Sequence, residues 1–159
     1  MEPARLERLW APWRSAFVSS PKGGRCIFCA AQRSRNDRRH HVVRRGKRVF
    51  ALLNRYPYNN GHLMVAPYRH VADLASVNAA EWDEIRRLSR QLIRRLRRVL
   101  HPQGFNMGLN LGRVAGAGIP GHLHVHLVPR WNGDTNFFPV IAQTKVISQS
   151  LDELYASLT

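Results

Sequence analysis

Cysteine, acidic side chains and long apolar stretches are all scarce in this chain of 159 residues. Its two cysteines, Cys26 and Cys29, are too few for the disulfide framework of a small secreted protein. No stretch approaches the roughly 18 consecutive apolar residues of a transmembrane helix, so we expect no membrane partner. The N-terminal stretch MEPARLERLW lacks the apolar region of a signal peptide, which leads us to expect a cytoplasmic protein.

The shortage of acidic residues leaves the chain strongly basic. Ten aspartates and glutamates stand against 25 lysines and arginines, which gives a net charge of +15. Such a charge favours anionic partners, for example nucleotides, nucleic acid or acidic surfaces. Because the arginines are spread over several segments, a solvated basic surface explains most of them equally well.

The length fits one domain. We expect it to span residues 1–159, with an N-terminal arm over 1–25, a core over 26–140 and a tail over 141–159. Residues 30–41 are polar and basic, and we expect them to form a loop.

Short apolar segments predict the strands of the core. The turn that ends in Asn60-Gly61 separates two of these segments and predicts that they form an antiparallel pair. The predicted strands cover residues 48–54, 62–67, 105–110 and 122–129.

One long helix is predicted between the second and third strands. Asn78 and Glu81 form a capping-box pattern, and apolar residues then recur at steps of three and four up to Val99. We expect the helix to end near His101 because Pro102 follows it. Seven arginines lie between its apolar positions, and they indicate either a solvated face or a nucleic-acid contact, of which the solvated face is the simpler.

A second capping-box pattern, Ser150 with Glu153, predicts a short final helix. Together these elements predict an α+β fold in which the long helix packs on an antiparallel sheet.

The segment GHLHVHLVPR places three histidines, His122, His124 and His126, at alternate positions. On a strand such residues share one face at separations of about 6.5–7 Å, while the aliphatic residues between them face the core. Three histidines in register favour a functional site over a polar strand face. Two kinds of site fit: a metal centre, and a nucleophile with supporting imidazoles.

A glycine-rich loop precedes these histidines. Residues 111–121 contain Gly112, Gly116, Gly118 and Gly121, so the backbone can approach a ligand closely. Backbone N–H groups in such a loop can donate to phosphate oxygens. A reaction at phosphorus uses both the loop and the histidines, whereas a metal site made of the three histidines leaves the loop unexplained.

The segment His122–Val128 resembles the motif of the histidine triad (HIT) family, in which three histidines alternate with apolar residues. The resemblance covers roughly residues 9–140. The tryptophan-containing segments on either side of the core resemble the Fhit-like and diadenosine tetraphosphate phosphorylase branch of the family. It implies a HIT-like fold, usually a homodimer, with a tetramer as the other possibility. The flanking segments that resemble the family are Leu9–Arg14, Phe50–Arg55, Gly61–Pro67 and Pro129–Phe137.

The resemblance implies nucleotidyl transfer through a covalent nucleotidyl-histidine, with phosphate or water as the acceptor. It implies that His124 attacks the α-phosphate, that His126 helps to orient and tune the site, and that His62 lies near the phosphates. Imidazole suits this role because it is a nucleophile at neutral pH while one nitrogen is unprotonated. The implied substrate contacts are Asn54 to the ribose, Phe50 and Leu52 near the base, and Asn110 near the α-phosphate.

Gly118 departs from the family pattern, because many members have Gln, Ser or Thr there. We expect backbone N–H groups from Ala117 to Ile119 to replace that side chain. Arg113 and Arg130 are candidate polyphosphate contacts. Trp131 is expected to stack on a base, to seal a dimer interface or, most simply, to pack internally.

Cys26-Ile-Phe-Cys29 is half of a common tetrahedral zinc site. A redox-active pair and inert cysteines are the alternatives. The resemblance to zinc-containing triad proteins adds His70 and His122, which implies a structural zinc held by these four residues. We expect no organic cofactor.

The leading functional prediction is an enzyme that cleaves dinucleoside polyphosphates such as diadenosine tetraphosphate. The alternatives are a nucleoside phosphoramidate hydrolase and a module that binds nucleic acid or adenylate with weak catalysis. Two remaining histidines, His40 and His41, are expected to be solvated.

Overall fold

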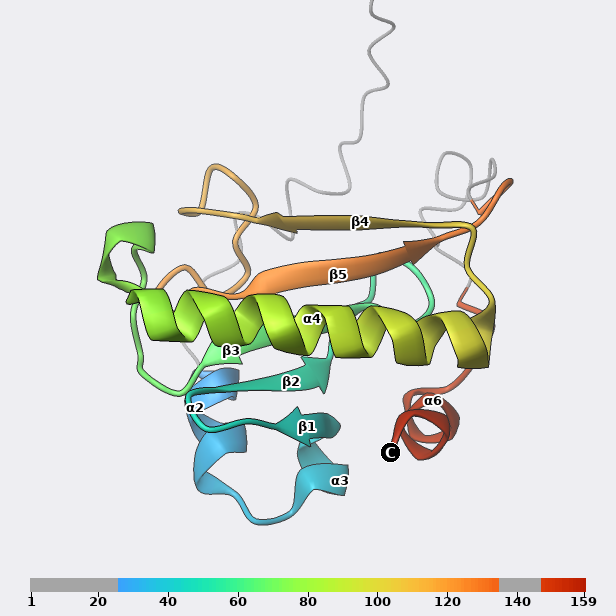
Figure 1. Cartoon of the computed structure of the whole chain (residues 1–159), viewed down its shortest axis with the longest axis horizontal. Helices are drawn as coiled ribbons and strands as arrows, with labels where there is room; N and C mark the ends of the chain where they lie inside the picture. The colour runs from blue at the N-terminus through green and yellow to red at the C-terminus, as the bar shows by residue number, and fades with distance from the viewer. Residues whose placement is uncertain (1–25, 135–146) are drawn as a thin grey trace, which may run out of the picture.

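The computed structural model describes residues 26–134 and 147–159, and its centre is an antiparallel sheet of five strands in the order β1-β2-β3-β5-β4 (Figure 1). The strands are β1 Val42–Arg45, β2 Val49–Leu53, β3 Leu63–Pro67, β4 Gly104–Leu109 and β5 Val125–Arg130. The helices are α2 Ile27–Arg33, α3 Asp37–His40, α4 Ala79–Leu100 and α6 Leu151–Leu158, with a 3-10 turn η1 at Leu74–Ser76. The predicted α+β architecture is therefore confirmed, while the expected arm over 1–25 lies outside the described residues.

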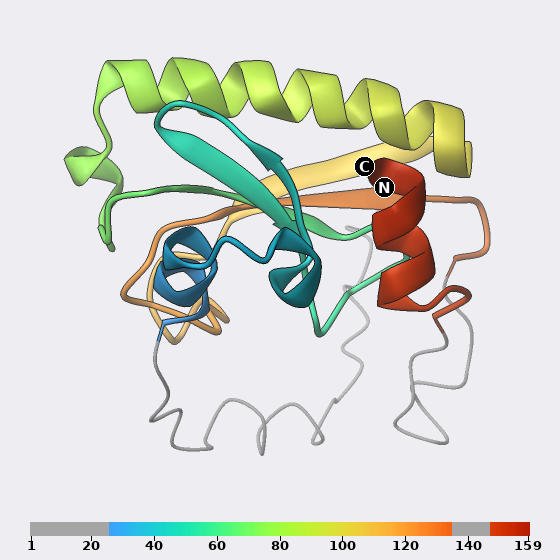
Figure 2. The ribbon, with the colours of Figure 1, turned by 90° about the horizontal axis from the view of Figure 1, so that it is seen from below.

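Helix α4 packs along one face of the sheet, as Figure 2 shows. Its predicted capping box is present: the Asn78 side chain accepts from Glu81 N, and the Glu81 carboxylate accepts from Asn78 N. The helix ends at His101, which adopts a left-handed conformation. Its apolar stripe packs against alternate residues of β2, β3 and β5, and burial of each such side chain contributes about 1.5–3 kcal/mol. The buried stripe consists of Ile85, Leu88, Leu92 and Leu96.

Glu81 joins the start of α4 to the loop after β3. Its side chain is buried and accepts two hydrogen bonds from the Arg69 guanidinium, at 2.8 and 2.6 Å, besides the one from Asn78 N. We expect Glu81→Gln to lower the unfolding free energy by about 2 kcal/mol, because it weakens charge-assisted bonds at a buried position. Urea denaturation measures the change. Asp83→Asn is the matched control, since the ion pairs of Asp83 lie at the surface and should contribute less than about 1 kcal/mol; equal losses would contradict the prediction.

The other face of the sheet is covered by α2 and α3 (Figure 2). The expected loop over 30–41 is wrong, because both helices fall within it or overlap it. Helix α3 begins where the Asn36 side chain accepts from Arg39 N. Arg45 then bonds the Asp37 carboxylate and two backbone carbonyl groups near the end of α2. These helices depend on contacts with Arg45, and the polar and basic composition of residues 30–41 does not indicate such contacts.

Strand β1 follows α3 directly, and the sequence analysis did not predict it. His41, at the junction, is also not solvated as expected. It has a φ of 52°, and its ring lies 3.6 Å from the Asp152 carboxylate of α6. His40 is half-buried. The two histidines therefore belong to the packed part of the fold.

The predicted strands over 48–54, 62–67 and 105–110 each agree with an observed strand to within one residue at each end. The antiparallel pairing of the first two is confirmed by the register Leu53↔Leu63. The last predicted strand begins later than expected, at Val125. Among the described residues, none of the helices combines the length and apolar character that crossing a bilayer requires.

Candidate active site and metal cluster

The three alternating histidines occupy the sheet face opposite α4. Leu123, Val125 and Leu127 belong to the core beneath α4, while His122 and His124 contact Phe28 of α2 and His126 contacts His62. This alternation holds although His122 and His124 precede the paired part of β5. The preceding segment is held in place by the hydrogen bond from Leu123 N to Val71 O, at 2.6 Å. The predicted division into two faces is therefore confirmed.

His124 is oriented by the backbone. Its Nδ1 lies 2.8 Å from the carbonyl oxygen of His122, and because a carbonyl only accepts, Nδ1 carries the hydrogen. The other nitrogen, Nε2, therefore has the lone pair. Burial also lowers the pKa of His124, which favours the neutral ring. The structure thus presents an unprotonated imidazole nitrogen at neutral pH.

His126 belongs to a second chain of hydrogen bonds. The backbone N–H of Tyr58 donates to His62 Nδ1 at 3.0 Å, so His62 carries its hydrogen on Nε2. That hydrogen is donated to His126 Nδ1 at 2.9 Å. His126 consequently carries its own hydrogen on Nε2; Asn110 Nδ2, which is also a donor, lies 3.4 Å away and makes no hydrogen bond with it. The arrangement places an N–H donor beside the His124 ring, whose centroid is 4.8 Å from that of His126.

Burial keeps these imidazoles neutral. Burial is the larger cause and repulsion between neighbouring imidazoles the smaller one, and together they lower the pKa of His62 to about 3 and that of His126 to about 4. The row of histidines is therefore uncharged under physiological conditions.

Neutral buried histidines make the fold sensitive to acid. In the unfolded chain His62 and His126 have the ordinary pKa of about 6.5, far above their folded values of about 3 and about 4. Above about pH 6.5 the contribution of these histidines to stability is fully present. As pH falls below about 6.5, the unfolded state binds protons that the folded state excludes, so this contribution is lost progressively toward pH 4. At pH 5 we expect each histidine to lower the unfolding free energy by about 2 kcal/mol relative to pH 7. Urea denaturation at the two pH values measures this loss.

Two variants test the assignment. His62→Asn should make the unfolding free energy less dependent on pH, whereas His101→Asn, at an exposed position, should leave the dependence unchanged. An unfolding free energy that is the same at pH 5 and pH 7 would contradict the burial of neutral imidazoles.

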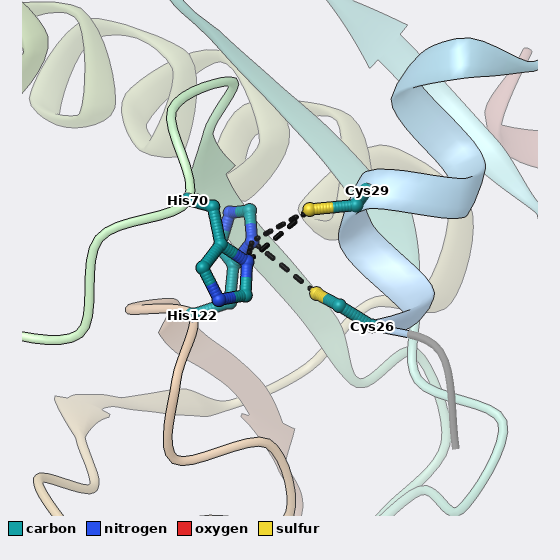
Figure 3. Close-up of side chains that lie close together, drawn as sticks. All are labelled: Cys26, Cys29, His70 and His122. Carbon is teal, nitrogen blue, oxygen red and sulfur yellow. Dashed lines mark hydrogen bonds between the residues drawn. The ribbon is translucent and has the colours of Figure 1, made fainter.

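Cys26, Cys29, His70 and His122 form a cluster, shown in Figure 3, in which four ligand atoms lie within 4.8 Å of one another. Cys26 Sγ is 3.4 Å from His122 Nδ1, Cys29 Sγ is 3.2 Å from His70 Nδ1, and the two Nδ1 atoms are 3.3 Å apart. Tetrahedral zinc, with bonds of about 2.0–2.3 Å, places its ligand atoms about 3.3–3.8 Å apart. The three printed separations lie close to that range, so these residues can hold a metal ion once the ligand atoms draw together around it.

His122 has the tautomer that a metal ligand needs. Its Nε2 lies 2.9 Å from the carbonyl oxygen of Pro67, so Nε2 carries the hydrogen and Nδ1 directs a lone pair into the cluster. Such a bond from the outer nitrogen of the ring is the usual support of a metal-binding histidine. His122 therefore faces the cysteines, while His124 and His126 form the catalytic candidates.

Phe28 links the metal cluster to His124. It lies on α2 between the two cysteines, it is fully buried, and its ring centroid is 4.9 Å from that of His122 and 4.8 Å from that of His124. This role of Phe28 was not predicted, although an aromatic residue inside the Cys-x-x-Cys segment was the available signal. The sequence carries no signal for the second contact, the Tyr58 N–H.

Of the predicted substrate residues, Asn54 and Asn110 lie within 3.4 Å of a histidine ring nitrogen. Asn54 Nδ2 is 3.3 Å from His62 Nδ1, and its Oδ1 accepts from Tyr56 N. Phe50 and Leu52 are buried in the core beneath α2, against which Ile119 also packs.

Gly118 and Ile119 lie in the loop before the histidines. Within that loop the Ala117 N–H donates to the Gly112 carbonyl, so it is already used. The expectation that N–H groups from Ala117 to Ile119 donate to a phosphate therefore stays a prediction, in which the Ala117 N–H already has a partner within the loop.

The three side chains predicted at the edges of the site are Arg113, Arg130 and Trp131, and two of them have partners among the described residues. Arg130 pairs with Asp134 and bonds Asn106, and Trp131 Nε1 donates to Leu100 O at 3.3 Å. Trp131 is half-buried and lines an open hollow, so its expected roles stay predictions. Arg113 is exposed in the glycine-rich loop.

Comparison with known proteins agrees with this geometry. The model of the HIT domain matches residues 35–133. The chain is 43% identical over 155 residues to an AP-4-A phosphorylase of Mycobacterium tuberculosis, covering 92% of this chain and 80% of that one. Among solved structures it resembles a hypothetical histidine triad nucleotide-binding protein of Sulfolobus tokodaii, at a TM-score of 0.64 and 25% identity over 84% of this chain and 86% of that one. A Zn-bound histidine triad family protein of Mycobacterium smegmatis matches with a TM-score of 0.61 and 24% identity, over 84% and 92% of the two chains.

Proposed function

This chain belongs to the HIT domain family, and we propose that it is an enzyme that cleaves dinucleoside polyphosphates such as diadenosine tetraphosphate. The observation that carries the proposal is the lone pair of His124 Nε2, fixed by the bond from Nδ1 to the His122 carbonyl. The substrate class is supported by 43% identity to a protein named AP-4-A phosphorylase.

The proposed reaction has two displacements at phosphorus. In the first, His124 Nε2 forms a bond to the α-phosphorus while the bond to the leaving nucleotide oxygen breaks. The ring becomes a nucleotidyl-imidazolium, and the His122 carbonyl, which accepts the Nδ1 hydrogen, stabilises its positive charge. In the second, phosphate or water attacks the same phosphorus and restores the free imidazole.

The other residues of the site are proposed to position the nucleotide. The Nε2 hydrogen of His126 is a donor to a phosphate oxygen, and His62 fixes that hydrogen in place. The remaining proposed contacts follow the family: Asn54 to the ribose, Phe50 and Leu52 on the base side, and Asn110, Gly118 and Ile119 near the phosphates.

We also propose that the metal held by Cys26, Cys29, His70 and His122 is zinc in a structural role. Two thiolates and two imidazoles form the donor set that zinc prefers, and the ligand separations fit it. All four positions are taken by protein, so the metal would fix α2 against the segment before β5 and take no part in the reaction.

A homodimer is proposed through β4. This strand is the last of the five in the sheet, and exposed apolar side chains lie on it and on the loop that follows. An edge strand of this kind is a template for pairing with another chain. The exposed residues are Met107, Leu111 and Val114.

The test is to incubate the protein with diadenosine tetraphosphate, with and without inorganic phosphate, and to separate the products. ADP and ATP formed only with phosphate would identify a phosphorylase, while AMP and ATP formed without phosphate would identify a hydrolase. If neither pair appears although AMP binds, the proposal of dinucleotide cleavage is wrong, and adenosine phosphoramidate becomes the next substrate to test.

A further inference from the structure

The outer face of α4 carries a concentration of positive charge that the proposed reaction does not use. From residue 85 to residue 100 the helix contains seven arginines and neither aspartate nor glutamate. Its acidic residues, Glu81, Asp83 and Glu84, all lie in the first two turns. Acidic and basic residues are therefore separated along the helix. On an ordinary solvated helix with many ion pairs, charges of opposite sign alternate.

Four of these arginines have no acidic partner among residues 26–134 and 147–159. Arg86 and Arg87 pair with Asp83, and Arg95 donates to the Ser157 carbonyl. No carboxylate of the described chain pairs with the others, and three of them line an open hollow of about 440 Å³ together with Gln91. The four are Arg90, Arg94, Arg97 and Arg98, all exposed. We call this set the arginine face.

The arginine face lies on the far side of the sheet from the histidines. Its helix packs by Ile85, Leu88, Leu92 and Leu96 on the core that Leu123 and its neighbours also form. Figure 2 shows α4 on one side of the sheet and α2, which covers the histidines, on the other. A nucleotide bound at His124 therefore cannot contact the arginine face.

We propose that the arginine face binds the phosphate backbone of a nucleic-acid duplex, independently of base sequence. From Arg90 to Arg98 the helix rises about 12 Å, and a duplex presents about seven phosphate charges over that length. Guanidinium groups bind phosphates through paired hydrogen bonds. The face offers no exposed aromatic ring to stack on a base, which indicates contact with the backbone alone.

A duplex fits this face better than an anionic membrane does. Helices that bind at a bilayer surface insert an apolar face beside their basic residues. The apolar face of α4 is buried in the core, and among the described residues the exposed large apolar side chains all lie outside α4. The charge is thus presented without any group that would enter the lipid.

The test is fluorescence anisotropy of the full chain with labelled 20-base-pair DNA and RNA duplexes at 50, 100 and 200 mM KCl. At 100 mM KCl we expect R90Q/R94Q/R98Q to weaken binding at least tenfold, with a slope of log affinity against log salt that is lower by about 2–3. R35Q/R38Q/R39Q is the matched control, because it removes the same charge from exposed positions at and before α3. It should weaken binding less than threefold.

Several results would overturn the proposal. These are no binding by the wild-type chain at 100 mM KCl, equal weakening by the two triple variants, and displacement of the duplex by saturating diadenosine tetraphosphate. Tighter binding to vesicles of anionic lipid than to either duplex, with the same dependence on the arginines, would do so as well. Thermal unfolding checks that the variants fold, and Arg94→Gln alone, with an expected decrease in slope of about 1, provides the test if the triple variant does not.

Discussion

Replacement of His124 by alanine is expected to lower turnover of diadenosine tetraphosphate by at least about 10³-fold, because a covalent step cannot proceed without its nucleophile. The expectation follows from the tautomer. The carbonyl of His122 holds the Nδ1 hydrogen of His124 at 2.8 Å and leaves Nε2 as the free nitrogen. Initial rates with excess substrate measure the loss. Because alanine removes a buried polar ring without exposing a charge, the variant should still fold.

The intermediate gives a more direct measurement than the rate. With substrate labelled at the α-phosphate, denaturation during turnover should leave label on the wild-type chain and none on His124→Ala. His40→Ala is the control variant, since it removes a half-buried histidine on α3, outside the site, and should retain both turnover and label. Label that persists in His124→Ala would show that another residue is the nucleophile.

Removal of the metal is the second large effect that we expect. The protein purified without chelators should contain about one zinc per chain, and C26S/C29S should contain none. We expect the variant to lose about 4 kcal/mol of unfolding free energy, which corresponds to a fall of about 10 °C in Tm. The reason is that the metal connects α2 to the segment before β5, and without it two cysteines and two histidines face one another with no common partner.

Metal loss should also affect the reaction. Phe28 lies on α2 between the two cysteines and packs on the His124 ring. If α2 is displaced, the His124 ring loses this contact and is held less firmly. We expect turnover to fall about tenfold in C26S/C29S, within the range of effects of groups that support a site from outside it. If the wild-type protein contains no zinc and both thiols titrate freely with a thiol reagent, the zinc proposal is wrong.

The parts of the fold that the sequence predicted are those fixed by local patterns. The Asn78 and Glu81 capping box and the spacing of the apolar residues determine α4, and the turn at Asn60-Gly61 determines the β2–β3 pair. In contrast, α2 and α3 depend on Arg45, which joins them from β1. In a chain with many arginines, the sequence does not indicate which one joins two helices.

The candidate site divides in the same way. Alternation along residues 122–126 predicted which side chains share a face, because the period of an extended backbone is two. It did not predict that His122 turns to the cysteines, which came from the family resemblance and fits the contacts. The fixed tautomer of His62 was unpredictable for a physical reason: it depends on a backbone N–H of Tyr58, and every residue type except proline has one.

The two halves of the metal cluster lie 96 residues apart along the chain, from Cys26 to His122. Contacts between such distant residues form late, because the entropy of closing the long loop must be overcome before they contribute. On the ribosome, the Cys-x-x-Cys segment emerges long before its histidine partners, and most of the sheet is synthesised in between. The nucleophile and the metal ligands are therefore completed in the same final step, so a nascent or truncated chain that ends before His122 has neither.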